Sequence, residues 1–373
     1  MTATAAGPAS PARIRAFDLA RGLAVGFMIL IHVLGHFGDE ASWTSPIGAV
    51  VTFLGGPLAA PVFMFLMGAS LAFSRRSTPG AIARRAIWLL ALAYTLNVLR
   101  GGLPATIGLA TGVVTDERIA PYTTPILLTM VDIHHMAGLS LLVIAVLAIV
   151  RRSPIAALSL GAVAVLAGPF LWGLTTGVGP VDHVLSLLWG REWFVFFPLF
   201  GWIVYPLAGL AYGTLLVRAP EPHAFIRRGA AFGGVLGLAG LALIATVDPF
   251  GGVDDYWRQG PGTVLAVVGV GLVWLGLCDA AVSRATGPAP RRVLGLLDGW
   301  SSRVTAMYCL HWILIGWSVG LVGHRTLELP AVLVAMVVVL VVTDQIVRRL
   351  PGLRPSPAAA PDEAARTASL ATT

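Results

Sequence analysis

The segment RIRAFDLARGLAVGFMILIHVLGHFGDE (residues 13–40) is a largely apolar stretch that carries ionisable side chains near both ends. At a rise of about 1.5 Å per residue, a helix over this segment is long enough to cross the hydrocarbon of a bilayer. Asp18 and Arg21 lie near one end of the stretch, and His32 and His36 lie near the other. Because polar groups are costly in hydrocarbon, we expect this helix to carry function.

The remainder of the chain repeats the apolar character of this segment. Of the 373 residues, 57% are hydrophobic and 12% are charged, and the mean hydropathy is +0.83. Apolar runs of about 20 residues predict membrane-spanning helices. The sequence therefore predicts an all-α, polytopic membrane helix bundle. Ten spans are expected, at residues 17–37, 47–74, 83–100, 125–150, 154–174, 194–217, 229–247, 262–283, 302–322 and 329–348.

The basic residues predict the orientation of the bundle. All 25 of them are arginines, because the chain contains no lysine. If the N-terminus is cytoplasmic, five arginines fall on the outer side and the other 20 fall inside, as the positive-inside rule requires. The sequence thus predicts cytoplasmic N- and C-termini in a multi-pass protein of the cell membrane. The five outer arginines are Arg100, Arg118, Arg191, Arg258 and Arg325.

The chain is expected to form one domain with two tails. Residues 1–12 and 351–373 are rich in Ala, Pro, Ser and Thr and are predicted to be disordered. Residues 13–350 are predicted to form a single transmembrane domain. Within its second span, the run Gly55-Gly56-Pro57 followed by Pro61 is expected to break or kink the helix, which is tolerated where the freed carbonyls line a cavity.

The four ionisable residues of the first span share one helical face. At about 100° per residue, Asp18 and His32 are about 40° apart and Arg21 and His32 are about 20° apart. His36 follows His32 by one turn, and Glu40 is expected one turn further on. A stripe of this kind is typical of the wall of a transmembrane path. The bland alternative is an Asp18–Arg21 pair at the interface and two histidines that satisfy buried hydrogen bonds.

The first span resembles the opening helix of the acyltransferase-three membrane family. The shared pattern is R-x-x-D-x-x-RG-x-A with a histidine eleven residues after the second arginine. It is formed here by Arg15, Asp18, Arg21, Gly22, Ala24 and His32. The segment MYCLHWILI (residues 307–315) resembles the ending of the same family. This resemblance implies a transmembrane acyltransferase fold.

A second resemblance is to the heparan-α-glucosaminide N-acetyltransferase family and its bacterial members. Four further segments carry it, namely EASW (40–43), PVFMFLMGAS (61–70), HHMAGLSLL (134–142) and FPLFGWIVYPLAGLAYG (197–213). Glu40 stands where the animal enzymes have a catalytic loop histidine, and His32 stands where they have asparagine. The two resemblances together imply that the catalytic imidazole lies on the first span.

Acyl transfer from a thioester needs a general base near neutral pH or an imidazole that carries the acyl group briefly. Histidine suits both roles, since its unperturbed pKa is about 6.5. We therefore expect His32 to be the catalytic residue, assisted by His36 and Glu40, with His135 as a partner across the tunnel. His311 is a weaker candidate.

The donor is expected to be acetyl-CoA or another acyl-CoA, which arrives from the cytoplasm. Arginines bind phosphates through forked, charge-assisted hydrogen bonds. The residues expected to hold the donor are Arg15, Asp18, Arg21, Arg75 and Arg76, with Arg84 and Arg85 nearby. The alternative for each arginine is a purely topological role.

The function predicted from the sequence is transfer of an acyl group to an amine or hydroxyl of a sugar or other glycan-like acceptor at the outer face. Membrane lipids are the expected surroundings, no nucleic-acid partner, metal or haem is expected, and an oligomer is compatible with the sequence. Three alternatives stay open: a transporter that uses the polar stripe as its path, a b-haem protein with His32 and His135 as axial ligands, and a non-catalytic lipid-binding member of the family.

Overall fold

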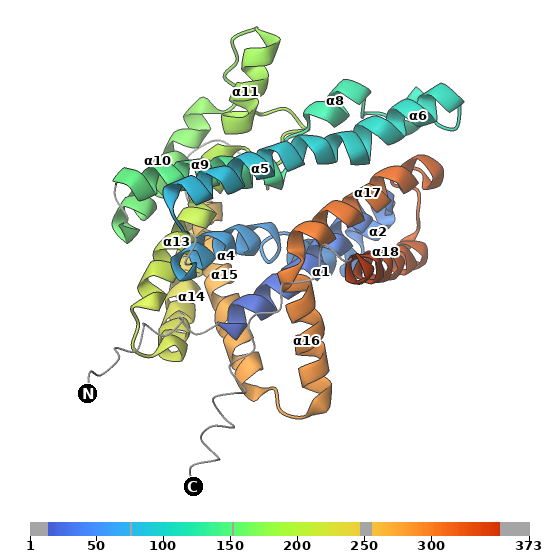
Figure 1. The fold of residues 1–373 in the computed structure, drawn as a ribbon. Coiled ribbons are helices and arrows are strands. Elements are labelled where there is room, and N and C mark those ends of the chain that lie inside the picture. Colours follow the sequence, from blue (N-terminus) through green and yellow to red (C-terminus); the bar gives the residue numbers. More distant parts are fainter. Residues whose placement is uncertain (1–13, 75–76, 151–152, 247–255, 351–373) are drawn as a thin grey trace, which may run out of the picture.

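The computed structural model describes residues 14–74, 77–150, 153–246 and 256–350, and this part of the chain is built of helices (Figure 1). The expected tails (residues 1–12 and 351–373) lie outside the described residues, as do Arg75 and Arg76. The long helices are α1 (Arg15–Phe37), α4 (Ala60–Phe73), α5 (Pro79–Asn97), α9 (Ile133–Val150), α10 (Pro154–Leu171), α13 (Val204–Val217), α14 (Pro222–Thr246), α15 (Pro261–Arg284), α16 (Pro288–Ser302), α17 (Val304–Val322) and α18 (Leu329–Arg349).

Shorter helices connect or extend these elements. They are α2 (Glu40–Thr44), α3 (Pro46–Gly55), the π-helix η1 (Val98–Gly102), α6 (Leu103–Thr111), α7 (Asp116–Ile119), α8 (Thr124–Thr129), α11 (Gly179–Trp189) and α12 (Leu199–Trp202). The all-α prediction is confirmed for the described residues, which contain no strand beyond isolated bridges.

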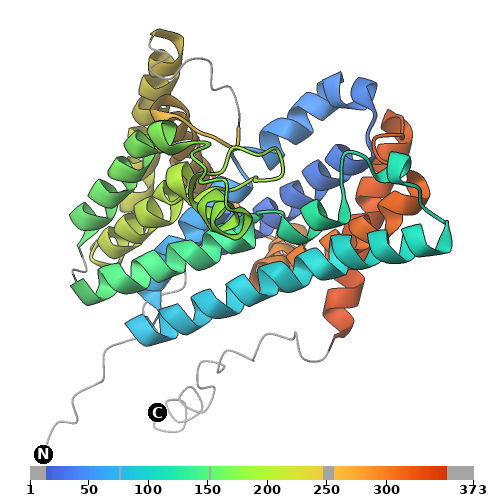
Figure 2. The same ribbon diagram turned by 90° about the horizontal axis from the view of Figure 1, so that it is seen from above.

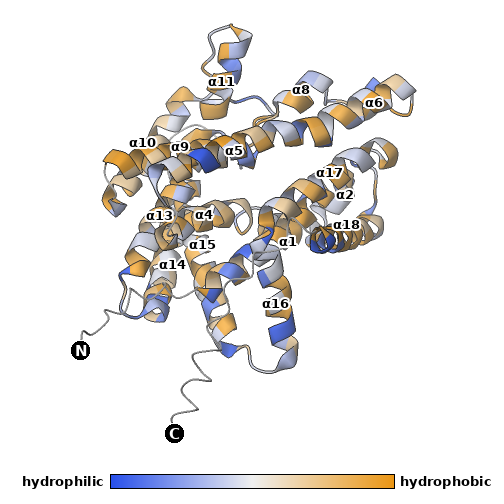
Figure 3. Cartoon of the chain, viewed as in Figure 1, coloured by the Kyte–Doolittle hydropathy of each residue, from blue (hydrophilic) through white to orange (hydrophobic). Residues whose placement is uncertain are grey.

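Nine helices in the described part of the chain are long and apolar enough to cross a membrane. They include two composite helices, Pro46–Phe73 and Pro79–Thr111. The sixth expected span, 194–217, contains instead the shorter apolar helix α13, because Pro198 and the non-helical Phe200 and Gly201 interrupt it. Hydrophilic residues gather around α16 and the adjoining ends of α14 and α15 (Figure 3).

The third span is longer than expected, and this corrects the position of one arginine. Arg100 was expected in an outer loop, but it lies within the composite helix Pro79–Thr111, in η1, and is 6% exposed. The sequence predicts a span at residues 83–100 that ends at Arg100. In the structure the helix continues beyond Arg100. Arg100 therefore does not count as a loop residue in the comparison of arginine numbers on the two sides of the membrane.

The predicted break in the second span is confirmed. Helix α3 ends at Gly55 and α4 begins at Ala60, and residues 56–59 form a turn between them. The backbone oxygen of Gly56 accepts a hydrogen bond from the Tyr256 hydroxyl at 3.0 Å. The carbonyl that the break frees is thus satisfied by a side chain instead of by the helix.

Helix α1 lies at the centre of the bundle, where it packs against α3, α4, α15, α16, α17 and α18 (Figures 1 and 2). One side of it, which includes Val25, Ile29 and Val33, is fully buried against α17 and α18. Any side chain on the opposite face of α1 is therefore held at a fixed position inside the protein.

Helices α4 and α13 approach closely because small residues line their contact. A Cβ atom added at Gly68 would overlap the backbone oxygen of Pro206, and one added at Gly209 would overlap the backbone oxygen of Phe65. Close approach of this kind is how helices pack in lipid, where apolar surface gives little drive for association. The small residues therefore fix α4, and with it the break before α4.

We predict that Gly209→Leu lowers the stability of the protein, because the new side chain meets backbone that has little room to move. Overpacking costs about 1–3 kcal/mol. Thermal unfolding in detergent measures the effect. Gly234→Leu is the matched control, because a Cβ at Gly234 has no neighbouring heavy atom within 4 Å. Equal Tm values for the two variants would contradict this account of the α4–α13 contact.

Candidate active site

A cavity of about 1260 Å³ follows one face of α1. Arg21, Met28, His32 and His36 line it at helical spacing, so three of the four residues of the expected stripe face the cavity. Near the start of α1 its wall includes Ser70, Arg85 and Ser301, and beyond the end of α1 it includes Glu40, Trp43 and Arg325. The cavity thus extends along most of the length of a membrane-spanning helix.

Arg21 is held in place at the N-terminal end of the cavity. Its guanidinium donates hydrogen bonds to the hydroxyls of Ser70 at 2.7 Å and Ser301 at 3.3 Å. Asp18 lies 3.6 Å from Arg21 and accepts a hydrogen bond from the Ser301 hydroxyl at 3.2 Å. The Asp18–Arg21 pair of the alternative interpretation is therefore present, and Asp18 contacts the cavity wall through Arg21 and Ser301. Arg15 is exposed at the start of α1.

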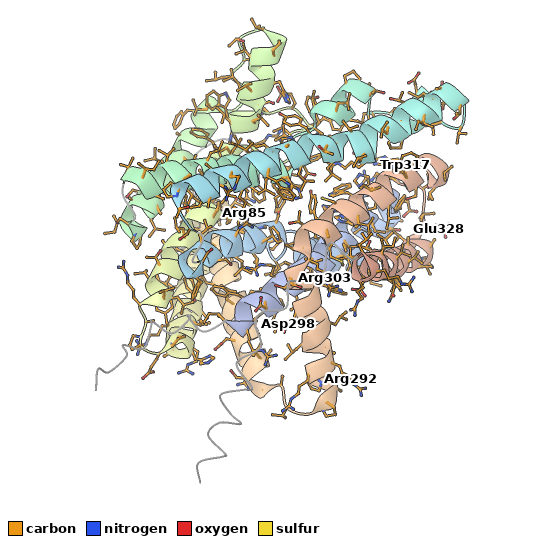
Figure 4. The ribbon with its side chains drawn as sticks, in the orientation of Figure 1. Arg85, Arg292, Asp298, Arg303, Trp317 and Glu328 are labelled. Carbon is orange, nitrogen blue, oxygen red and sulfur yellow. The ribbon has the colours of Figure 1, made fainter. Side chains whose placement is uncertain are left out.

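Other basic residues lie around this end of the cavity. Arg85 projects from α5 and lines the wall. Figure 4 shows Arg303 at the junction of α16 and α17, and Arg292 at the far end of α16. The residues that follow Arg303, Val304 and Thr305, also line the cavity. Of these arginines, Arg85 alone lines the cavity.

A chain of hydrogen bonds fixes the proton on His32. The Nδ1 atom of His311 is 2.9 Å from the backbone oxygen of Met307, and because a carbonyl only accepts, Nδ1 of His311 carries the proton. The Nε2 atom of neutral His311 is then an acceptor. It lies 2.9 Å from Nδ1 of His32, which must donate to it. The lone pair of neutral His32 is therefore on Nε2.

His36 has the same tautomer as His32, and Glu40 is not placed to orient His36. Nδ1 of His36 donates to the backbone oxygen of His32 at 3.1 Å. The expected continuation of the helix to Glu40 is wrong, because α1 ends at Phe37 and Gly38 has extended backbone angles. The Glu40 side chain is 79% exposed and lies 3.8 Å from Arg325.

Side chains outside the membrane-spanning helices stabilise the segment around Glu40. Asp39 caps α2 by accepting a hydrogen bond from the Ser42 amide at 2.8 Å, and bonds from Ser42 lower the pKa of the Asp39 carboxyl. His324 packs its ring 6.0 Å from that of His36, and burial lowers the pKa of His324. Three ionisable side chains, Glu40, His324 and Arg325, thus lie near the C-terminal end of α1.

A buried ion pair lies beside the two histidines of α1. Arg100 Nη1 is 2.6 Å from the Asp132 carboxylate, and the two side chains are 6% and 8% exposed. The guanidinium also donates to the Asn97 side-chain oxygen at 3.1 Å and lies 4.4 Å from the Trp312 ring centroid. That Trp312 ring is 4.3 Å from the His32 ring. The pair and the histidines therefore form one connected cluster.

Asp132 reaches the cluster because the expected fourth span is broken. Helix α8 ends at Thr129 and α9 begins at Ile133. Asn97 donates to the backbone oxygen of Met130 at 2.7 Å, and Val131 pairs through its backbone with Phe194 and Phe196. Irregular backbone is tolerated at membrane depth when its polar groups are satisfied in this way.

His134, and not His135, lines the cavity. The His134 ring packs edge-on against Tyr308 with 4.4 Å between centroids. The Nδ1 atom of His135 accepts a hydrogen bond from the Asp132 amide at 3.1 Å, so the lone pair of its neutral ring is already used. Its ring packs against Tyr94 at 4.6 Å, away from His32. The structure does not bring His135 and His32 together.

The sequence predictions missed Arg100 and undervalued His311. Nothing in the local pattern distinguishes Arg100 from a loop arginine, because it is followed by Gly101, Gly102 and Pro104. Tyr308, His311 and Trp312 lie at the i, i+3 and i+4 spacing that places them on one face of α17. Among the described residues, no group of three His, Cys, Asp or Glu side chains is placed to hold a metal ion, and Cys278 and Cys309 are free thiols.

Comparison with protein families gives a match that covers most of the chain. Residues 14–346 match the acyltransferase-3 family, whose description is "Acyltransferase domain". This match confirms the first of the two resemblances seen in the sequence, and the resemblance to heparan-α-glucosaminide N-acetyltransferases is not confirmed. A comparison with curated proteins found no match.

We predict that removal of either charge of the Arg100–Asp132 pair destabilises the protein by about 3–5 kcal/mol, because it leaves the other charge buried and unpaired. Arg100→Gln, Asp132→Asn and the double variant form the cycle, with thermal unfolding in detergent as the measurement. Asparagine keeps the side-chain oxygen that accepts the Ile133 amide. The double variant should lose less stability than the sum of the two single losses. Additive losses would mean that the two side chains are not coupled.

Proposed function

Because this chain belongs to the acyltransferase-3 family, which it matches over residues 14–346, we propose that it moves an acetyl group from acetyl-CoA to a hydroxyl or amine of a sugar-like acceptor. Donor and acceptor reach His32 from opposite ends of the cavity along α1. The proposal is supported by one observation above all: the hydrogen bonds of His32 and His311 leave the lone pair of His32 on Nε2.

His32 serves as the general base in this proposal. Its Nε2 atom takes the proton from the acceptor's O–H or N–H group while that oxygen or nitrogen attacks the thioester carbonyl carbon. The C–S bond then breaks, and the leaving CoA thiolate takes the proton back from Nε2. His311 stabilises the imidazolium through its Nε2 acceptor and prevents the ring of His32 from turning.

The acyl-CoA end of the cavity is proposed to lie at the start of α1. Arg21 and Arg85 line that end, and guanidinium groups suit phosphate oxygens. Arg15 is exposed nearby and is available to the nucleotide. The excess of arginines in the loops on the side of the α1 N-terminus supports assigning this end to the cytoplasm, where acyl-CoA is present.

The acceptor is proposed to occupy the other end and to enter it from the outer face of the membrane. Trp43 and Tyr122 line this part of the cavity, where they pack near Arg325 and His324. Aromatic faces suit the apolar face of a sugar ring, and a few polar groups then fix its orientation. Glu40 and Arg325 supply such groups at the rim. A cavity with aromatic and charged groups at one end and arginines at the other suits two chemically different substrates.

A transporter would use the same cavity as a continuous path, and a non-catalytic family member would bind lipid in it. Both alternatives predict no release of CoA. Incubation of the purified protein with acetyl-CoA and a panel of amino sugars and neutral sugars tests the proposal. Acceptor-dependent release of CoA supports an acyltransferase, and flux of the acceptor without CoA release supports a transporter.

We predict that His32→Ala lowers kcat by about 10² to 10⁴-fold, the usual cost of a lost general base. The fold should persist, since His32 is only partly buried. His135→Ala is the comparison variant: it removes a buried hydrogen bond, which costs about 1–3 kcal/mol of stability, with a smaller effect on rate. Near-normal turnover of folded His32→Ala would remove His32 from the mechanism.

We further predict that Arg85→Gln raises the KM for acetyl-CoA at least about fivefold and changes kcat less, because a contact to the non-reacting part of the donor contributes equally to substrate and transition state. Arg84→Gln is the matched control: Arg84 has the same charge and the adjacent position on α5 but does not line the cavity. Equal KM values for the two variants would place the donor elsewhere.

A further inference from the structure

A second chamber of about 260 Å³ adjoins the main cavity between α6 and α17. Its walls are largely apolar and include Ala105, Ile107, Val114, Ile315 and Val319. Figure 1 shows α6 and α17 side by side at one end of the bundle, and Figure 4 shows Trp317 between them. The Trp317 indole donates to the backbone oxygen of Leu99 at 2.9 Å, which holds α17 against the start of this chamber.

The chamber adjoins the site around His32, and the two spaces share part of their walls. Five residues line both spaces, and they are His36, Arg100, Tyr122, Met130 and Trp312. Trp312 lies within 4.3 Å of the His32 ring, measured between centroids. A group that reacts at His32 therefore has an apolar side space beside it, behind the wall formed by Arg100, Met130 and Trp312.

The size of this side space is informative. A molecule of liquid water takes about 30 Å³, and a methyl group is of similar size. The chamber is thus several times larger than the methyl group of an acetyl requires. Its charged neighbour, Arg100, is neutralised by Asp132, so the space favours an uncharged, apolar occupant.

We infer that this chamber holds the hydrocarbon chain of the acyl group, so that the enzyme accepts acyl groups longer than acetyl. The inference rests on the proposed function and adds the class of donor. The thioester carbonyl lies at His32, the pantetheine arm extends toward Arg21, and the acyl chain passes Trp312 into the space between α6 and α17. Each methylene that an apolar pocket accommodates is worth about tenfold or more in kcat/KM.

The rival occupant is a bilayer lipid. The outer wall of the chamber includes Ile107, Val113 and Leu321, which are 45%, 54% and 67% exposed and face outward. The wall that the chamber shares with the His32 site favours the acyl chain, because a lipid resident in the chamber would need no contact with Trp312 and His36. The experiment therefore includes an arm for each occupant.

The test compares kcat/KM for hexanoyl-CoA with kcat/KM for acetyl-CoA. Ala105→Leu fills the chamber, and it should lower the hexanoyl-to-acetyl ratio at least about tenfold. Ala110→Leu is the matched control, since Ala110 lies on the same helix but is exposed and does not line the chamber. Val114→Ala enlarges the chamber and should raise the ratio for octanoyl-CoA, so the inference does not depend on one variant that folds poorly.

The outcomes separate this inference from the function on which it rests. If the wild-type protein turns over acetyl-CoA but both chamber variants keep the wild-type ratios, the chamber does not hold the acyl chain. If the wild-type protein turns over no acyl-CoA, the proposed function fails first. Octanoyl-CoA with a photoreactive terminal group should label α6 or α17, and excess acetyl-CoA should reduce that labelling. Labelling by a photoreactive phospholipid that acetyl-CoA does not reduce would assign the chamber to a lipid and overturn the inference.

Discussion

The ion pair between Arg100 and Asp132 is the interaction on which the centre of this protein depends. A buried charge at membrane depth is costly unless it is paired, and here each partner requires the other at 2.6 Å. The pair joins η1 to the break between α8 and α9, and Arg100 carries the contact onward to Trp312 of α17. One electrostatic requirement thus ties three elements that are distant in sequence to the face of α1 that bears His32.

The chemistry of His32 follows from that arrangement. Helix α17 is held against η1, where a side chain at Gly316 would overlap the backbone of Arg100, and this contact sets the depth of His311. His311 in turn donates its one N–H group to the backbone oxygen of Met307 and accepts a hydrogen bond from Nδ1 of His32. The resulting lone pair on Nε2 of His32 is a property of the whole cluster, because a change in the position of α17 would free the His32 ring to turn.

The features that the sequence predicted well are those that depend on local residues. The polar face of α1 follows from helical spacing, and the break before α4 follows from Gly55, Gly56 and Pro57. Arg100 was placed wrongly because its partner, Asp132, is 32 positions away, and no local pattern records that contact. Glu40 was misplaced for the opposite reason: the one-turn spacing was extrapolated past Gly38, where the helix ends. The role of His311 could not be predicted from the sequence, because it depends on the packing of α17 beside His32.

The central claim is that donor and acceptor meet at His32 from opposite sides of the membrane. It is tested most directly in proteoliposomes in which the protein has one orientation, established by the accessibility of an N-terminal tag. Acetyl-CoA is supplied on the side of the α1 N-terminus and the sugar acceptor on the other side. The account predicts acetylated product on the acceptor side and free CoA on the donor side. Product that forms only when both substrates are on the same side would contradict it.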